Sequence, residues 1–270
     1  MSKIADVTGF GEIDKTDDPE YFARFLAAGA GCRGNPEARA AALEALRVGE
    51  GQAILEVGCG LGAAVVEVAP MVGPKGRAVG VDISETMIEK ARTRLDAQGL
   101  PVEFHRADAR ALPFEDRSFD GCRADFLLVS LAEPERALGE LVRVLKPAGR
   151  LVVLDTDHET QFVDTPYPET TRILVRTLSE GEASGTIGRC LPRLFEEQGL
   201  VEIEVRPFVV LFTHEFFRLL FEGIVLRAQE LGKLATDDAR KWWDHLEEAN
   251  ASGTFFAGTS VFVVSGTRPG

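Results

Sequence analysis

The 270-residue sequence has few cysteines, and none of them are clustered. Cys32, Cys59, Cys122 and Cys190 stand far apart, without a Cys-x-x-Cys pair. Such spacing argues against a disulfide framework and against a zinc site, and it suits a reducing compartment. The chain also lacks an apolar run long enough to span a bilayer, and its first residues lack the apolar core of a signal peptide. We therefore expect a cytoplasmic protein without a metal site.

Positive charge is scarce as well. The chain has 30 Lys and Arg against 43 Asp and Glu, which gives a formal net charge of -13. Nucleic-acid binding depends on Lys and Arg that neutralise phosphates, and no basic cluster stands out, so we expect no nucleic-acid partner. An acidic surface also disfavours anionic membranes. The expected partner is a small molecule, and the oligomeric state stays open, a homodimer included.

Strand and helix patterns alternate from Ala53 onward. The expected strands are 53–58, 77–83, 101–107, 118–124 and 149–155, and the expected helices between them are 62–72, 84–98 and 133–146. This alternation predicts right-handed crossovers and an α/β fold, with a mostly parallel sheet that helices cover on both faces. Residues 1–50 predict an N-terminal helical cap, so the expected division is a cap over 1–50 and a main domain over 51–270.

The last hundred residues follow a looser pattern. A Thr/Asp/Pro-rich stretch from Asp155 to Pro168 predicts a loop. Helices are expected near 169–180 and 187–199, and strands at 201–212 and 254–267, with helices at 214–232 and 236–250 between these strands. We expect the late strands to form an antiparallel pair at the sheet edge, with a helical insertion at about 213–250.

The first expected strand ends in a glycine-rich turn, Glu56-Val57-Gly58-Cys59-Gly60-Leu61-Gly62. Glycines let the backbone bend sharply and approach a ligand closely. Glu56 ends the strand, where its carboxylate is placed to meet a cationic group. A tight turn with no ligand is the alternative. The spacing Gly58-x-Gly60-x-x-Ala63 also fits the fingerprint of a nicotinamide-dependent oxidoreductase.

Acidic residues follow the next two strands. Asp82 lies about twenty residues past the glycine turn, where a carboxylate can accept hydrogen bonds from ribose hydroxyls, and Ile83 can cover an adenine ring. Asp82 can equally cap the helix that follows. Asp108 can accept from an adenine amino group while the Ala109 amide meets a ring nitrogen. The alternative is that Asp108 is an ordinary loop residue.

These ordered segments resemble the class I S-adenosylmethionine-dependent methyltransferases that act on small molecules, over about residues 50 to 155. The resemblance implies a Rossmann-like sheet of seven strands in the order 3-2-1-4-5-7-6, with the seventh antiparallel, and S-adenosylmethionine as cofactor. It implies that the cofactor-binding residues are Glu56, Gly58, Cys59, Gly60 and Gly62 at the methionine part, Asp82 and Ile83 at the ribose and adenine, Asp108 and Ala109 at the adenine edge, and Asp125.

The chain departs from this family after the fourth strand. Many relatives have an Arg or Ser there, followed by a Leu-x-His near the methyl group. Here Asp125 and Ser130 occupy those places, so a base cannot come from that histidine. His158 is the predicted base because the pKa of histidine suits proton transfer near neutrality, and Asp157 or Asp155 can instead orient a substrate. The alternative is that His158 is a solvated loop residue.

Aromatic residues suggest where an acceptor binds. Tyr21 in the cap can contact a sulfonium by a cation–π interaction or through its hydroxyl, or it can simply pack in the cap. The insertion is rich in Phe and Trp, most of which must be core, yet their density favours an apolar or aromatic acceptor. The sequence therefore predicts methyl transfer to such a metabolite. A protein that binds S-adenosylmethionine without transferring its methyl group is one alternative, and an NAD(P)-dependent oxidoreductase, against which Glu56 and Asp108 argue, is another.

Overall fold

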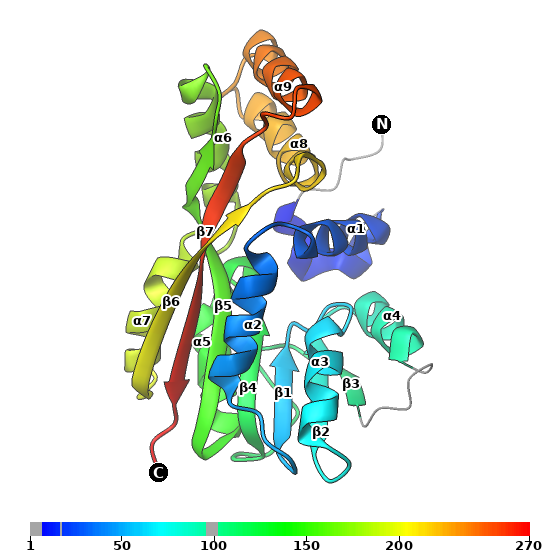
Figure 1. The fold of residues 1–270 in the computed structure, drawn as a ribbon, viewed down its shortest axis with the longest axis vertical. Helices are drawn as coiled ribbons and strands as arrows, with labels where there is room; N and C mark the ends of the chain where they lie inside the picture. The colour runs from blue at the N-terminus through cyan, green and yellow to red at the C-terminus, as the bar shows by residue number, and fades with distance from the viewer. Residues whose placement is uncertain (1–6, 17, 96–101) are drawn as a thin grey trace.

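The computed structural model describes residues 7–16, 18–95 and 102–270. Within these ranges, seven strands form one sheet in the order β3-β2-β1-β4-β5-β7-β6, as predicted (Figure 1). The strands are β1 (Ala53–Val57), β2 (Arg77–Asp82), β3 (Val102–Arg106), β4 (Phe119–Asp125), β5 (Leu145–Val163), β6 (Val201–Leu211) and β7 (Ala257–Thr267). Strands β1 to β5 pair in parallel, and β7 runs antiparallel to both β5 and β6.

The strands alternate their side chains between two hydrophobic clusters, one on each face of the sheet. In β5, Val152 and Leu154 belong to one cluster, whereas Leu151 and Val153 belong to the other. Because successive side chains of a strand point to opposite faces, a strand covered on both faces must be apolar throughout. The runs of Val, Ile and Leu in β1, β2 and β5 meet this need.

Helices cover both faces. One face carries α2 (Asn35–Leu46), α3 (Ala63–Val72) and α4 (Glu85–Leu95), and the other carries α5 (Pro134–Val144) and α7 (Ile187–Glu197). In α5 the buried residues recur at helical spacing and so form one stripe toward the sheet. Helix α2, which the sequence places in the cap, packs on β5 and β7. The boundary at residue 50 stays a prediction.

The predicted end of the fifth strand is wrong. Strand β5 continues past Asp155 to Val163, because it keeps pairing with β7 as far as the pair Val163–Ala257, across an irregularity between Asp157 and Phe162. The Thr-rich composition that suggested a loop is also what strands favour, since β-branched residues fit a pleated sheet. The other expected elements agree within a few residues, except that the expected positions 96–98 and 101 lie outside the described residues.

The upper halves of β5 and β7 form an arm that carries the insertion (Figure 1). Helix α6 (Pro168–Gly181) follows β5, and the pair α8 (His214–Glu230) and α9 (Thr236–Ala251) connects β6 to β7, as predicted. Figure 1 shows these three helices gathered at one end of the molecule. Helix α6 packs on both α8 and α9.

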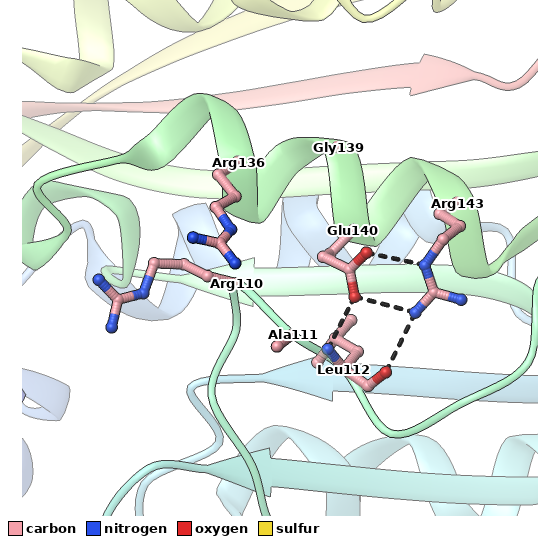
Figure 2. A pocket seen from close by; sticks show the side chains of 7 residues that line it. All are labelled: Arg110, Ala111, Leu112, Arg136, Gly139, Glu140 and Arg143. Carbon is pink, nitrogen blue, oxygen red and sulfur yellow. Dashed lines mark hydrogen bonds and ion pairs between the residues drawn. The ribbon is translucent and has the colours of Figure 1, made fainter.

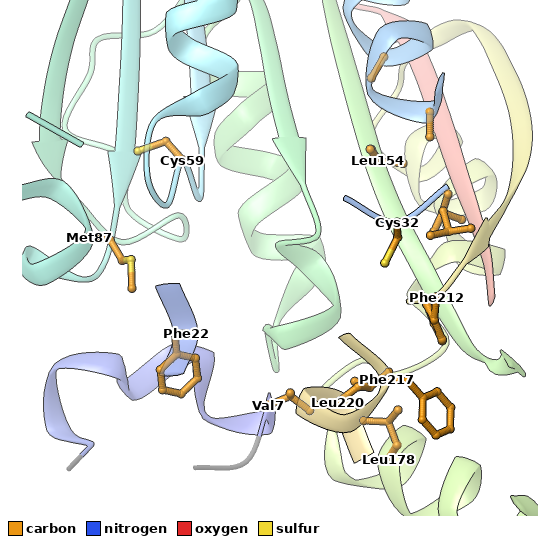
Figure 3. Packing of buried hydrophobic residues seen from close by; sticks show 14 of the residues in the cluster. Val7, Phe22, Cys32, Cys59, Met87, Leu154, Leu178, Phe212, Phe217 and Leu220 are labelled. Carbon is orange, nitrogen blue, oxygen red and sulfur yellow. The ribbon is translucent and has the colours of Figure 1, made fainter. Parts of the chain in front are cut away.

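The N-terminal segments lie across the carboxyl edge of the sheet. They are η1 (Val7–Lys15), a 3-10 helix with a kink at Glu12, and α1 (Pro19–Ala30). Segment η1 contacts α4 at one end of this edge and α8 and η2 (Leu128–Ser130) at the other. Figure 3 shows Val7 beside Leu220 of α8 and Phe22 of α1 nearer Met87 of α4, within one hydrophobic cluster.

Among the residues so placed, we find no helix with the length and apolar character that a membrane crossing requires.

Candidate cofactor and active site

The glycine turn has the geometry that its sequence predicts. Gly58, Gly60 and Gly62 all have positive φ angles, of 73°, 49° and 76°. The amides of Gly58 and Cys59 donate to the carbonyl of Val81, at 2.8 and 2.9 Å, which ties the turn to β2. A Cβ on Gly58 would lie 2.9 Å from the side chain of Leu127, so only glycine fits there. The turn therefore forms a backbone cradle without side chains of its own at these three positions.

Asp82 links this turn to the start of α4. Its carboxylate accepts from the Gly60 amide at 2.8 Å and from the Ser84 amide at 3.0 Å. Burial raises the pKa of Asp82, although these backbone hydrogen bonds act in the opposite direction. Ser84 in turn accepts from the Met87 amide and caps α4. Both predicted roles are compatible, because the capping belongs to Ser84, while Asp82 stands at the strand end beside Ile83, whose side chain is exposed.

The start of α4 has a second acidic partner that the sequence analysis missed. Asp14 of η1 accepts from the Ser84 hydroxyl at 2.6 Å and from the Glu85 and Thr86 amides at 2.8 and 3.2 Å. Burial opposes ionisation, yet these hydrogen bonds lower the pKa of Asp14 to about 2. Segment η1 is thereby fastened to the same strand-to-helix junction that holds Asp82.

Asp108 is held by the residue two positions after it. The Arg110 side chain donates to both carboxylate oxygens, at 3.0 and 2.8 Å, and holds the pKa of Asp108 below its usual range. Ala109 is buried next to it. A pocket of about 640 Å³ lies between this loop and α5, where Arg110, Arg136 and Glu140 line it (Figure 2). Glu140 there accepts from the Leu112 amide, which fixes the loop that carries Asp108.

Glu56 and Asp125 meet a buried arginine. Arg123 of β4 pairs with Glu56 of β1 in the sheet register, and its side chain is fully buried. Its Nε and Nη2 donate to the two carboxylate oxygens of Asp125, at 2.8 and 2.6 Å, and its Nε lies 3.7 Å from Glu56 Oε2. Arg39 of α2 reaches Asp125 from the other side, at 3.8 Å. The two acids predicted for the cofactor are therefore part of one charged cluster.

The electrostatics of this cluster are uneven. Burial, followed by repulsion from Asp125, raises the pKa of Glu56 to about 8. Burial alone would lower the pKa of Arg123, but Asp125 and Glu56 outweigh it and hold the pKa above its usual range. Arg123 Nη1 is buried and has no hydrogen-bond partner among the residues that the structure describes, and it lies 3.9 Å from a carboxylate oxygen of Glu67 in α3.

A second buried acid fixes the segment after β4. Asp155 accepts from the Leu128 and Val129 amides at 2.9 and 3.2 Å, and burial raises its pKa to about 7 despite these bonds. Leu127 just before them touches Gly58, so this segment begins at the glycine turn. Ser130 at its end lies 3.5 Å from a carboxylate oxygen of Glu182, a buried residue that follows α6.

The loop predicted around His158 does not exist, because His158 and Asp157 lie within β5. His158 is buried, so it is not a solvated loop residue, and burial lowers its pKa to about 4. Its Nδ1 is 3.1 Å from the Gln161 amide nitrogen. Asp157 faces α7, where Arg189 binds both of its carboxylate oxygens. At neutral pH His158 is uncharged and a weak base, and its predicted catalytic role stays a prediction.

Tyr21 packs in the contact between the cap and the insertion. Its hydroxyl donates to the Leu219 carbonyl of α8 at 2.6 Å, and its ring lies edge-on to Phe22. Next to it, the ring of Phe25 lies 4.9 Å from that of Phe216 in α8. Leu26 approaches the glycine turn, since a Cβ on Gly60 would lie 3.2 Å from it. Neighbouring residues of α1 therefore contact both the aromatic side chains of α8 and the glycine turn.

Comparison with known proteins agrees with this geometry. A family model described as a methyltransferase domain matches residues 54–149. The chain is 36% identical over 227 residues to an uncharacterized 37.1 kDa protein in transposon Tn4556 of Streptomyces fradiae. The matched region covers 82% of this chain and 64% of that protein, so this chain spans less than two thirds of the length of that relative. It is 32% identical over 174 residues to a demethylmenaquinone methyltransferase of Bacillus cytotoxicus, over 58% of this chain and 73% of that protein.

A solved structure of a relative shares the fold. The crystal structure of a SAM-dependent methyltransferase from Aquifex aeolicus superposes with a TM-score of 0.53 at 26% identity, over 71% of this chain and 91% of that one. Together with the strand order, these matches show that the chain belongs to the class I S-adenosylmethionine-dependent methyltransferases, and that S-adenosylmethionine is its cofactor. This assignment decides against the oxidoreductase alternative.

Sequence reasoning missed Arg123, Arg39 and Asp14. Arg123 carried a signal, because a charged residue stands between Cys122 and Ala124 inside a predicted strand. Arg39 and Asp14 carried none, since each reaches its partner from a segment distant in sequence.

Proposed function

We propose that this protein transfers the methyl group of S-adenosylmethionine to a small apolar or aromatic acceptor that binds between α1 and α8. One observation carries the proposal: the aromatic contact of Phe25 with Phe216 lies one residue from Leu26, which touches the glycine turn. An apolar region thus adjoins the expected donor site directly. Most ligand pockets are apolar with a few placed polar groups, which suits such an acceptor.

The described residues fit the donor. The glycine turn offers a cradle that a Cβ would fill, and Asp82 ends β2 with a carboxylate already turned toward that cradle. We assign Gly58, Cys59, Gly60 and Gly62 to the methionine part, with Glu56 and Asp125 for its ammonium group. Asp82 and Ile83 are assigned to the ribose and adenine, and Asp108 with Ala109 to the adenine edge.

The bound cofactor supplies an electrophilic methyl group on a sulfonium. The chain has to align the acceptor with this methyl group and exclude water, which can account for most of the rate enhancement in such a displacement. Leu26, Leu127 and the rings of the cap serve to exclude water. Tyr21 shapes this wall, because its hydroxyl is engaged by α8.

The likeness to a demethylmenaquinone methyltransferase supports a quinol-type acceptor. Such a ring is apolar and electron-rich, and it needs little help from a protein base to attack a methyl group. Weak basicity at His158 is therefore compatible with transfer.

The test is a product search. Purified protein is incubated with methyl-deuterated S-adenosylmethionine and with a panel of reduced short-chain demethylmenaquinone, simple phenols and fatty acids, followed by mass spectrometry. We expect a labelled methyl group on an aromatic member of the panel and none on the fatty acids. Labelling of the fatty acids alone would refute the assignment of an aromatic acceptor.

The second candidate, a protein that binds the cofactor without transferring its methyl group, is favoured by one observation. Ser130 stands where relatives have a histidine, and the remaining candidate base, His158, is buried with a lowered pKa. Tight donor binding without any labelled product from the panel or from a cell extract would favour it over methyl transfer.

A further inference from the structure

A fully buried arginine in the middle of a sheet needs a reason. Taking a guanidinium out of water costs several kcal/mol, and replacing a buried ion pair by apolar residues is often neutral or stabilising. Position 123 is fully buried in a strand of a sheet that helices cover on both faces, where apolar side chains are the usual choice. The stability of the fold therefore does not by itself explain why a charged residue occupies position 123.

The location of Arg123 suggests the reason. Its fork binds both oxygens of Asp125, and it lies beside Glu56, so it bridges the carboxyl ends of β1 and β4. Glu56 stands two residues before Gly58, where the cradle begins. A planar guanidinium fixes a carboxylate in two directions, which a lysine cannot do.

The charges of the cluster do not balance. Facing Glu56 are Asp125 and Arg123 on β4, Arg39 on α2 and Glu67 on α3. Two cations thus stand against three acids, and Arg123 Nη1 has no hydrogen-bond partner in the described part of the chain. Once the Glu56 carboxyl is ionised, the cluster is short of one positive charge, which is what the ammonium group of a methionine moiety carries.

We propose that Arg123 is a positioning residue of the donor site, which holds Asp125 and Glu56 in place to receive the ammonium group of S-adenosylmethionine. This inference rests on the proposed function. When the ammonium group arrives, the Glu56 carboxyl releases its proton to solvent and becomes the anion. Because the pKa of Glu56 in the free protein is raised to about 8, donor affinity increases as the pH rises toward that value.

The experiment measures the dissociation constant of S-adenosylmethionine by calorimetry between pH 6 and 9, and each pH profile is corrected for the titration of the donor's own α-amino group, whose pKa is about 8. The variants are Arg123→Met, Arg123→Lys and Glu56→Gln. Arg150→Met is the matched control, because Arg150 is a second buried arginine of the sheet but binds only neutral groups, Ala45 O, Ser265 and Thr267, within hydrogen-bond distance.

We expect Arg123→Met to weaken donor binding about 30-fold and to move the midpoint of the pH dependence up by about one unit, because both acids lose their counter-charge. Arg123→Lys restores the midpoint and weakens binding about fivefold, since it keeps the charge without the fork. Glu56→Gln removes the pH dependence. Arg150→Met lowers the melting temperature and leaves donor affinity within about twofold.

Two results separate the possible failures. If Arg123→Met and Arg123→Lys bind the donor with the affinity and pH midpoint of the wild type, Arg123 is purely structural and the inference is wrong, while the proposed function stands. If the wild-type protein does not bind S-adenosylmethionine, the proposed function itself fails. Should Arg123→Met not fold, Arg123→Lys and Glu56→Gln still decide, because the inference requires a fivefold loss in one and a flat pH profile in the other.

Discussion

The two halves of the sheet each bury an arginine, and the arginines differ in what surrounds them. Arg150 in the amino-terminal half lies level with the start of β1 and donates to a carbonyl and two hydroxyls, and burial lowers its pKa. Arg123 in the carboxyl-terminal half lies among carboxylates that raise its pKa, and its Nη1 makes no hydrogen bond within the described residues. The hydrogen bonds of Arg150 go to neutral groups, with the Glu202 carboxylate 4.0 Å away, whereas those of Arg123 go to the carboxylate of Asp125.

The difference between the two arginines separates a structural role in one half of the sheet from a proposed ligand-binding role in the other. A buried polar group that is fully hydrogen-bonded stabilises the fold and needs nothing further. An acid-rich cluster with an unmatched donor is costly on its own and improves when a ligand brings the missing charge. The carboxyl ends of parallel strands are where such folds bind ligands, and here the imbalance lies at that edge.

The largest effect on donor binding is expected for Asp82→Ala. Asp82 belongs to the carboxyl edge, so its loss should weaken donor binding about 100-fold through lost charge-assisted hydrogen bonds to the ribose. Calorimetric titration with S-adenosylmethionine measures this. Unchanged affinity, with only a loss of stability, would make Asp82 a purely structural residue that holds Gly60 and Ser84.

A second test uses pH, because the buried groups Glu56, Asp155 and His158 lie in the carboxyl-terminal part of the sheet and have shifted pKa values. His158 has its pKa lowered to about 4, so the unfolded chain takes up its proton first as the pH falls below 6.5. Its contribution to stability is therefore present above pH 6.5 and is lost between pH 6.5 and 4. We expect His158→Asn to remove roughly 2 kcal/mol of this acid-induced loss.

The measurement for His158→Asn is the difference in unfolding free energy between pH 7 and pH 5 for variant and wild type. Glu56 and Asp155 give the opposite trend, because their raised pKa values stabilise the folded state at low pH and lose this effect as the pH rises. Comparing variant with wild type cancels that trend. An equal pH dependence in both proteins would show that His158 is not buried in solution.

The smallest effect is expected at the far end of η1. Asp14→Ala removes a carboxylate that caps α4 from another segment, so we expect about 1 kcal/mol of lost stability in chemical denaturation. Because the pKa of Asp14 is lowered to about 2, this contribution is present above pH 4 and disappears as the pH falls through 2. A decrease in unfolding free energy as large as that of Arg150→Met would contradict the expectation that Asp14 contributes little to stability.

The sequence predicts the sheet order and the glycine turn because both depend on local patterns and on a family resemblance. It fails at β5, where Asp157 and His158 look like a loop, but the strand continues because Asp157 pairs with Ser260 and Phe162 with Gly258 of β7, about a hundred residues later. It also misses Arg39 and Asp14, since their partners lie on segments that only the folded chain brings together. Arg123 could have been singled out as a charged residue between Cys122 and Ala124 inside a predicted strand, but its partners could not.

One feature of the fold bears on how such enzymes diversify. Strand β5 runs for 19 residues, with irregularities between Leu145 and Arg150 and between Asp157 and Phe162, and its outer part pairs with β7 beyond the body of the sheet. Helices α6, α8 and α9, which would select the acceptor, are connected to this outer part of the sheet and not to the strands that carry the glycine turn. Evolution or protein engineering could therefore replace α6, α8 and α9 by other helices without changing the residues assigned to the methyl donor.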